Sequence, residues 1–203
     1  MHKWDRLPDP TTEVAAHQRQ YFNALADVFD VPQPKDVMDR VRQIVASADL
    51  RPGEAVLDVG TGTGVLVPPY RPSHVLACDL AEHMLARVRK NHPNVLAFQC
   101  DIVRSAVRAA SLDVIFMNAM FGNIADKPTA CSNAAQALRP GGRLIVSHPE
   151  GRAFVDQLRA AGDLFIESFP TREEFQALLA PTGLEVVSYQ DEPKLFVMLA
   201  RRR

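Results

Sequence analysis

The sequence contains few cysteines and no long apolar run, and both shortages exclude whole classes of protein. The three cysteines, Cys78, Cys100 and Cys131, are scattered and have no C-x-x-C spacing, so we expect neither a disulfide framework nor a metal site. No apolar run approaches the roughly 20 residues that a membrane-spanning helix needs. The N-terminal stretch M-H-K-W-D-R-L-P-D-P lacks the apolar core of a signal peptide. These features predict a cytoplasmic location in a reducing compartment.

The sequence also lacks an excess of positive or negative charge. The 203 residues include 23 basic and 24 acidic side chains, for a formal net charge of -1, so the composition indicates neither nucleic acid nor an anionic membrane as a partner. The hydrophobic fraction of 47% is enough for a substantial core in a chain of this length. We therefore expect one α/β unit with small-molecule partners. The oligomeric state is not indicated.

The most informative stretch is A-V-L-D-V-G-T-G-T-G-V, residues 55–65. It opens with an apolar run between turn residues, which predicts a buried strand. Three glycines follow at alternate positions, Gly60, Gly62 and Gly64, and each lets the backbone turn sharply or lets a ligand approach where a Cβ would stand. A strand, a glycine-rich turn and a helix start form a nucleotide-binding crevice at the carboxyl end of a sheet. A tight turn that binds no ligand is the alternative.

Strand and helix patterns alternate along the rest of the chain, which predicts a doubly wound, mostly parallel seven-stranded sheet with helices on both faces. The last two strand patterns are joined only by Q-D-E-P-K, too short for a crossover helix, so they predict a C-terminal antiparallel hairpin. The expected strands are 55–59, 74–78, 95–99, 112–117, 143–147, 185–189 and 195–200. The expected helices are 11–29, 36–48, a short one after residue 64, 81–91, a weak one at 103–109, and 127–138.

The glycine spacing separates two classes of nucleotide-binding protein. Asp58 stands two residues before Gly60, and the pattern D-x-G-x-G-x-G differs from the dinucleotide fingerprint G-x-G-x-x-G. It resembles the first motif of the Rossmann-like (class I) S-adenosylmethionine-dependent methyltransferases. From Tyr21 onward the chain is similar to their small bacterial type-11-like group. The resemblance implies S-adenosyl-L-methionine as the cofactor, with Thr61 and the glycines against its methionine part and Asp58 near its ammonium.

A second motif, H-V-L-A-C-D-L-A-E-H-M-L at residues 74–85, also matches this family. The resemblance implies that Asp79 accepts hydrogen bonds from both ribose hydroxyls, since a carboxylate has two acceptor oxygens for a diol. Leu80 and Met84 are then expected beside the cofactor. The alternative for Asp79 is a helix-capping box, because Asp79 and Glu82 have D-x-x-E spacing.

Two later motifs continue the series. In F-Q-C-D-I, residues 98–102, the resemblance implies that Asp101 receives the adenine amino group with Ile102 beside the ring; the alternative is a turn residue. In L-D-V-I-F-M-N-A-M-F, residues 112–121, Asn118 ends a strand and is implied to face the cofactor. Asn123 follows in the loop where relatives often carry histidine, and we expect it to contact the acceptor.

The chain divides, on this interpretation, into an N-terminal helical lid at 1–50 and a cofactor-binding domain at 51–203, with a helical cap inserted at 151–182. Pro68 and Pro69 cannot continue a helix, so the first helix of the domain should be short and the crevice needs another cover. In similar enzymes an aromatic residue of the N-terminal helix touches the methionine end, and Tyr21 is the candidate. Packing in the core is the alternative for this aromatic face.

The predicted catalytic and acceptor-binding residues follow the strand at 143–147. His148 stands at the carboxyl end of that strand, next to the crevice, and an imidazole accepts a proton near neutral pH. Glu150 is a second candidate for removing a proton, and Arg152 a candidate anchor for a carboxylate or phosphate of the acceptor. The alternative for His148 is a strand-end polar residue bonded to backbone.

These motifs favour an enzyme that transfers a methyl group to a small-molecule acceptor by in-line displacement, without metal. A non-catalytic S-adenosylmethionine-binding protein, such as a sensor or a complex subunit, stays open. An NAD(P)-dependent oxidoreductase is less favoured because its fingerprint is missing. A nucleic-acid methyltransferase is disfavoured because N-A-M-F at 118–121 lacks both prolines of the N-P-P-F motif. Neither the acceptor nor the methylated atom is indicated.

Overall fold

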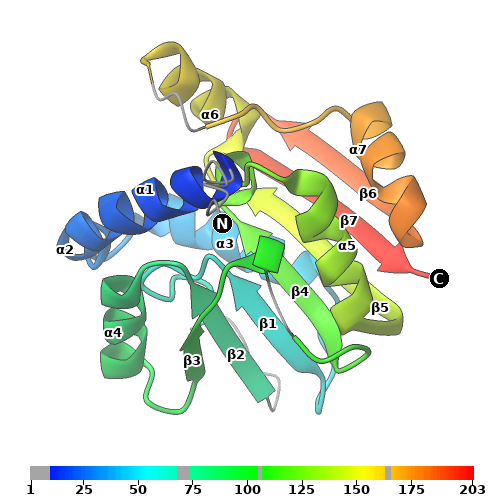
Figure 1. Cartoon of the computed structure of the whole chain (residues 1–203), viewed down its shortest axis with the longest axis horizontal. Coiled ribbons are helices and arrows are strands. Elements are labelled where there is room, and N and C mark those ends of the chain that lie inside the picture. The colour runs from blue at the N-terminus through cyan, green and yellow to red at the C-terminus, as the bar shows by residue number, and fades with distance from the viewer. Residues whose placement is uncertain (1–9, 68–73, 105–106, 163–165) are drawn as a thin grey trace, which may run out of the picture.

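A computed structural model describes residues 10–67, 74–104, 107–162 and 166–203. Its centre is a seven-stranded sheet with the order β3-β2-β1-β4-β5-β7-β6 (Figure 1). The first five strands are parallel, and β7 runs antiparallel to both β5 and β6. The strands are β1 (Ala55–Val59), β2 (His74–Asp79), β3 (Leu96–Gln99), β4 (Leu112–Asn118), β5 (Leu138–His148), β6 (Leu184–Glu192) and β7 (Leu195–Arg202). The predicted mostly parallel sheet with a C-terminal hairpin is confirmed.

Helices cover both faces of this sheet. They are α1 (Pro10–Ala24), α2 (Ala26–Phe29), α3 (Lys35–Ser47), α4 (Glu82–Asn91), α5 (Lys127–Ala137), α6 (Gly151–Ala160) and α7 (Arg172–Leu179). The described residues also include three short 3₁₀ turns: η1 (Ile102–Arg104) after β3, η2 (Phe121–Asn123) after β4 and η3 (Ala180–Thr182) after α7.

Alternate residues of the central strands belong to two separate cores. Leu57, Ile115 and Leu144 pack in a core with α5 and α7, whereas the neighbouring Val56 and Val114 pack with α3 on the opposite face. This alternation is the period of two that a strand imposes on its side chains. Because both faces are covered, the strands read as continuous apolar runs in the sequence.

Several element boundaries differ from those expected. The helix predicted at 11–29 is interrupted at Leu25, which separates α1 from α2. The second helix starts at Lys35 with Pro34 at its N-cap, so Asp36 lies inside the first turn and pairs with Arg40 at 3.0 Å. At 103–109 the described residues form only the 3₁₀ turn η1. After residue 64 the chain turns without a helix up to residue 67, and Pro68 and Pro69 lie outside the described residues.

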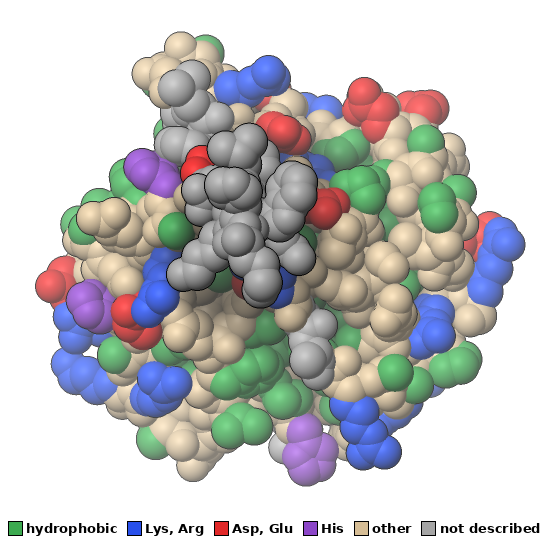
Figure 2. All heavy atoms as spheres, in the orientation of Figure 1, with side chains coloured by type: hydrophobic (Ala, Val, Ile, Leu, Met, Phe, Trp, Pro, Cys, Tyr) green, Lys and Arg blue, Asp and Glu red, His purple; other side chains and the backbone are tan. Residues whose placement is uncertain are grey.

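The strand order positions the candidate site. β1 lies between β2 and β4, so the chain reverses its direction of travel across the sheet at this point, and ligands of such sheets bind at the carboxyl ends there. The helix pair α1–α2 lies across these strand ends (Figure 1). On the face drawn in Figure 2, basic and acidic side chains are both scattered, mainly toward the margin.

Candidate active site

The loop after β1 is built from glycines in conformations that other residues avoid. Gly60, Gly62 and Gly64 have φ angles of 64°, 55° and 94°, in the left-handed region where a Cβ is disfavoured. At Gly60 a Cβ would lie 2.7 Å from Met120 Cγ, so glycine lets two loops approach each other. At Gly62 a Cβ would meet nothing within 4 Å, so the backbone there borders open space.

Asp58 is a buried carboxyl group at the end of β1, with 1% of its surface exposed. Its Oδ2 accepts a 2.8 Å hydrogen bond from the Thr61 hydroxyl. The pKa of Asp58 is raised to about 7, mainly by burial; the Thr61 hydroxyl opposes this rise and the charge of Asp79 adds to it. A nearby cation would favour the ionised form, so the site is suited to a positively charged ligand group.

Asp79, at the end of β2, joins the glycine loop to the start of α4. Its two oxygens accept 2.9 Å hydrogen bonds from the N–H groups of Gly62 and Ala81. Burial raises the pKa of Asp79, and these backbone donors act in the opposite direction. The capping box that the sequence offered as an alternative does not form, because Glu82 binds Arg19 and α4 has no side-chain cap at Ala81.

Asp101 lies in the turn that follows β3. Its Oδ1 accepts a 2.9 Å hydrogen bond from the Val103 N–H, which makes it a turn residue as well as part of the site. Asn133 of α5 donates to the carbonyls of Ile102 and Val103, at 2.8 and 3.0 Å. This contact fixes the turn, and Ile102 is buried with 4% exposure.

The end of β4 is held in a strained conformation. Asn118 Oδ1 accepts a 2.9 Å hydrogen bond from the Ser147 hydroxyl of β5. The next residue, Ala119, has a φ of 54° although it is not glycine, which costs about 1–2 kcal/mol. Its N–H donates to the Ser147 carbonyl at 2.8 Å, so the two strands hold the strain where this loop borders the crevice.

His148, at the end of β5, is oriented by a backbone donor. The Glu150 N–H donates to His148 Nδ1 at 3.1 Å, so in the neutral ring the proton is on Nε2. Burial lowers the pKa of His148 to about 4, and the ring packs between Phe154 and Phe169 with centroids 5.4 and 6.1 Å away. A neutral imidazole with a protonated Nε2 is a hydrogen-bond donor.

Glu150 and Arg152 have other partners. Glu150 Oε1 accepts a 2.9 Å bond from Arg40 of α3. Arg152 donates to the carbonyls of Phe169 and Pro170 and to the Tyr189 hydroxyl of β6. Arg152 therefore joins α6 to the C-terminal hairpin and does not line the cavity described below.

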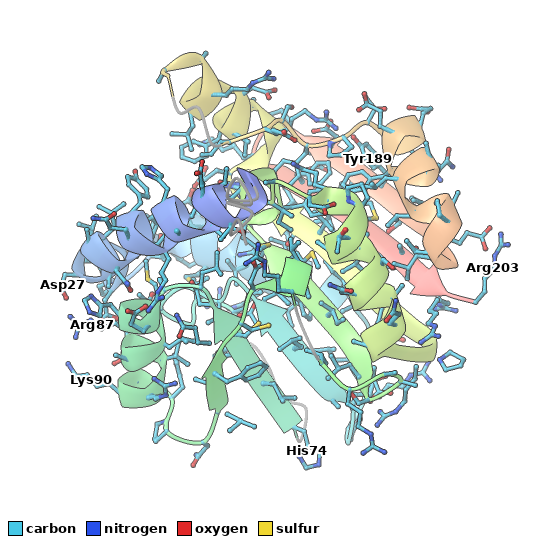
Figure 3. The ribbon with its side chains drawn as sticks, viewed as in Figure 1. Asp27, His74, Arg87, Lys90, Tyr189 and Arg203 are labelled. Atoms are coloured by element: carbon cyan, nitrogen blue, oxygen red, sulfur yellow. The ribbon has the colours of Figure 1, made fainter. Side chains whose placement is uncertain are left out.

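The helix pair α1–α2 is attached to α4 mainly by polar contacts. Arg19 makes two bonds to Glu82, at 2.8 and 2.9 Å. Asn23 Oδ1 accepts from the His83 N–H at 2.9 Å, so it satisfies a first-turn donor of α4. Figure 3 shows Asp27 of α2 beside Arg87 of α4, and the two form an ion pair.

Gln18 of α1 makes a further contact that the sequence did not reveal. The side chain has 7% exposure, and its Nε2 donates to the Asn123 carbonyl at 2.6 Å, closing the helix onto η2. Gln18 and Asn23 were both missed, because each bonds a residue far away in the sequence and neither belongs to a motif. The missing cap at Ala81 was the one signal that could have led to Asn23.

One cavity of about 1330 Å³ gathers these residues. Of the sequence-predicted site residues, Arg152 alone is absent from its described lining. Those that line it are Tyr21, Asp58, Gly60, Thr61, Gly62, Gly64, Asp79, Leu80, Met84, Asp101, Ile102, Asn118, Asn123, His148 and Glu150. Apart from Met84 of α4 and Asn123 of η2, they come from α1 and from the carboxyl ends of five parallel strands, which is why residues so far apart in sequence share one cavity.

Within the described ranges, no group of three His, Cys, Asp or Glu residues is arranged to hold a metal ion. The same part of the chain has no helix long and apolar enough to cross a membrane. The three cysteines form no disulfide.

Comparison with known proteins identifies the family of the chain. A family model described as a methyltransferase domain matches residues 17–189. The fold and the site define a Rossmann-like protein that uses S-adenosylmethionine. The chain belongs to the methyltransferase domain family, and this membership decides against the nicotinamide oxidoreductase that the sequence left as an alternative.

Individual relatives are distant but cover much of the chain. A demethylmenaquinone methyltransferase of Streptomyces avermitilis is 29% identical over 157 residues, which are 74% of this chain and 66% of that enzyme. An O-methyltransferase of Aspergillus nomiae is 26% identical over 91% of this chain and 94% of its own length. The magnesium protoporphyrin IX methyltransferase of Synechocystis, solved with bound SAH, has a TM-score of 0.71 at 17% identity and covers 94% of this chain and 100% of that chain.

The buried Asp58 carboxyl generates a prediction about pH. Its pKa in the folded protein, about 7, exceeds the ordinary value of 3.8, so the folded state binds the extra proton and stability falls as pH rises from about 4 through 7. Asp58→Asn should therefore stabilise the ligand-free protein at pH 8 by roughly 2–4 kcal/mol. It should also reduce the loss of stability between pH 5 and pH 8. Urea unfolding at pH 5 and pH 8 measures both effects.

The matched control is Asp156→Asn, which changes an exposed carboxyl of α6. Its stability should change with pH as that of wild type does. If Asp58→Asn and wild type lose the same stability between the two pH values, then Asp58 is ionised in the ligand-free protein and the assignment of its pKa is wrong.

Proposed function

We propose that this chain transfers a methyl group from S-adenosylmethionine to a small-molecule acceptor by in-line displacement. One observation carries the proposal: a single cavity joins the glycine loop and its carboxylates to an apolar region formed by α1, α3 and α6. A typical ligand site has about 300–1,000 Å³. The cavity of about 1330 Å³ is therefore large enough for a cofactor and an acceptor together.

The residues of the glycine end suit the cofactor. The backbone at Gly62 borders open space, so a ligand can lie against it. Asp58 has the raised pKa that a cationic group such as the cofactor's ammonium would lower. On the proposal Asp79 binds the ribose, Asp101 and Ile102 the adenine, and Tyr21 the methionine end.

When bound, S-adenosylmethionine supplies a methyl group already activated by the sulfonium charge. The chain's own contribution is to hold the acceptor in line, which lowers the entropic part of the barrier, and to keep water out. We propose that His148 donates a hydrogen bond from Nε2 to the acceptor. Its geometry and lowered pKa favour this role over removal of a proton, and the pairing of Glu150 with Arg40 disfavours a base there.

The proposed acceptor is a small molecule. The relatives of this chain include a demethylmenaquinone methyltransferase and an O-methyltransferase. The near-zero net charge of -1 supports the proposal that no nucleic acid is bound. The three free cysteines are compatible with the proposed location of the protein in a reducing cytoplasm.

A comparison of two acids tests the cofactor assignment. Asp79→Ala should weaken binding of S-adenosylhomocysteine at least about 100-fold, because two hydrogen bonds to a charged acceptor are lost and each contributes about 1.5–3 kcal/mol. Asp101→Ala, which loses one such bond, should weaken it about tenfold. Isothermal calorimetry measures both, with NAD as the ligand that should not bind.

Thermal unfolding provides the control, because Asp79 also holds Gly62 and Ala81: the affinity must be measured where each variant is folded. If Asp79→Ala binds S-adenosylhomocysteine as tightly as wild type does, then Asp79 has only a structural role. Binding without methyl transfer to any acceptor would instead favour the non-catalytic S-adenosylmethionine-binding protein.

We also propose that α1 and α2 form a lid. The two main cores contain no described residue before Val37, and the apolar contact of the lid is small, with Ala26, Ala81 and Met84 buried and Phe22 beside them. Exposed ion pairs such as Arg19–Glu82 contribute little to stability, because solvent screens the two charges. Contacts this weak allow opening without unfolding of the sheet.

Deletion of residues 1–29 should therefore leave a cooperatively folded sheet, weaken the binding of S-adenosylhomocysteine and abolish turnover, because the cavity loses a wall. In the full chain, S-adenosylhomocysteine should slow proteolysis before Phe29. Limited proteolysis with and without this ligand measures the effect. Unchanged cleavage, or aggregation of the deleted chain, would show that the helices are permanent core.

A further inference from the structure

Among the Asp, Glu, Lys and Arg side chains, only acidic ones line the described part of the cavity. Its carboxyl groups are Asp30, Asp58, Asp79, Asp101 and Glu150. Neither lysine nor arginine lines it among the residues that the structure describes. A cavity that receives a carboxylate or phosphate normally presents arginine, lysine or a cluster of backbone donors to that group.

Two of the three imidazoles in the described lining, His92 and His148, do not replace the missing cations, and the third, His17, is an exposed side chain of α1. Burial lowers the pKa of His148 to about 4, and burial also lowers the pKa of His92 against a smaller opposing effect of Asp30. Both rings are therefore neutral at pH 7. In addition, the Glu150 N–H occupies His148 Nδ1, so this ring offers one donor and no charge.

Two arginines near the site, Arg152 and Arg40, are paired with other residues. Arg152, the sequence-predicted anion anchor, lies 2.8 Å from Asp191 through its Nε, and its guanidinium carbon is 5.5 Å from the Phe196 ring centroid. Arg40 is held by Asp36 at 3.0 Å and Glu150 at 2.9 Å. Moving either guanidinium toward an acceptor would break a partly buried ion pair.

The cavity also collects the exposed apolar side chains of the molecule. Among the described residues, eight large hydrophobic side chains are exposed, and five of them line this cavity: Tyr21, Phe29, Val31, Phe154 and Leu158. Exposed apolar side chains that gather at one cavity indicate a binding surface, whereas scattered ones do not. They come from α1, α2, the segment after α2 and α6, so the apolar part lies between the proposed lid and the cap helix.

We infer that the acceptor carries no negative charge and has an apolar body that contacts α6 and the N-terminal helices. The inference rests on the proposed function, since it concerns the molecule that shares the cavity with the cofactor. An anionic acceptor would lose its hydration beside carboxylates without gaining a lysine or arginine partner from the described lining. A neutral or cationic acceptor avoids this cost and gains the burial of its apolar surface.

Two fluorescent probes that differ only in charge test the inference. N-phenylnaphthylamine is uncharged, and anilinonaphthalene sulfonate has the same rings with a sulfonate; both brighten in apolar sites. With the wild-type protein saturated with S-adenosylhomocysteine, we expect the neutral probe to bind and the sulfonate to bind at least about tenfold more weakly. Titration by fluorescence gives both dissociation constants.

Variants locate the bound probe. Phe154 and Leu158 are 39% and 37% exposed, so the double variant Phe154→Ala/Leu158→Ala should fold and weaken the neutral probe at least about fivefold. Leu158→Lys should tighten the sulfonate by a similar factor. The matched controls are Val187→Ala and Val187→Lys, at a 52% exposed site on β6 outside the cavity lining, and they should change neither probe.

Three results would overturn the inference: sulfonate binding as tight as that of the neutral probe, no binding of the neutral probe, or neutral-probe binding that the α6 double variant leaves unchanged. Calorimetry with S-adenosylhomocysteine on the same protein separates the two proposals. Loss of that binding contradicts the methyltransferase assignment, whereas normal binding together with any of the three probe results contradicts only the charge and apolarity of the acceptor.

Discussion

Two neighbouring carboxyl groups buried at the ends of adjacent strands, Asp58 of β1 and Asp79 of β2, set the main constraint on this structure. Burial raises the pKa of both groups, and the charge of Asp79 raises that of Asp58 as well. The chain compensates with local donors, the Thr61 hydroxyl for Asp58 and two backbone N–H groups for Asp79. The glycine loop supplies two of these three donors, so its shape and the placement of the acids depend on each other.

This constraint sets function against stability. A fold selected for stability alone would fill these positions with apolar side chains, as it does at Val56 and Leu57 one or two residues earlier. The strained backbone at Ala119 lies at the same end of the sheet. Buried acids and backbone strain both lower the stability of the fold. A protein that binds a charged nucleotide-like ligand is expected to have such features at its ligand site, because contacts with the ligand can offset the lost stability there.

The sequence predicted the sheet, its closing hairpin and the residues at the strand ends, because apolar runs, glycine spacing and strand-end acids are local signals. It did not predict the break at Leu25, the 3₁₀ turn in place of a helix after Ile102, or the orientation of Arg152. Those depend on contacts between distant segments. Arg152 is the clearest case: its position after the strand at 143–147 suggested an anchor, but Tyr189 and Asp191 of β6 determine where its guanidinium lies.

The amide contributed by Asn23 has a thermodynamic consequence. It satisfies a donor at the beginning of α4, and the residue before that helix, Ala81, donates to Asp79, which in turn accepts from Gly62. A single helix end thus connects the N-terminal helices to the nucleotide-binding loop. Any factor by which a closed lid tightens the cofactor must equal the factor by which the cofactor favours closure. If α1 and α2 act as the proposed lid, a substitution in α1 that changes how often the lid is closed also changes the affinity for the cofactor.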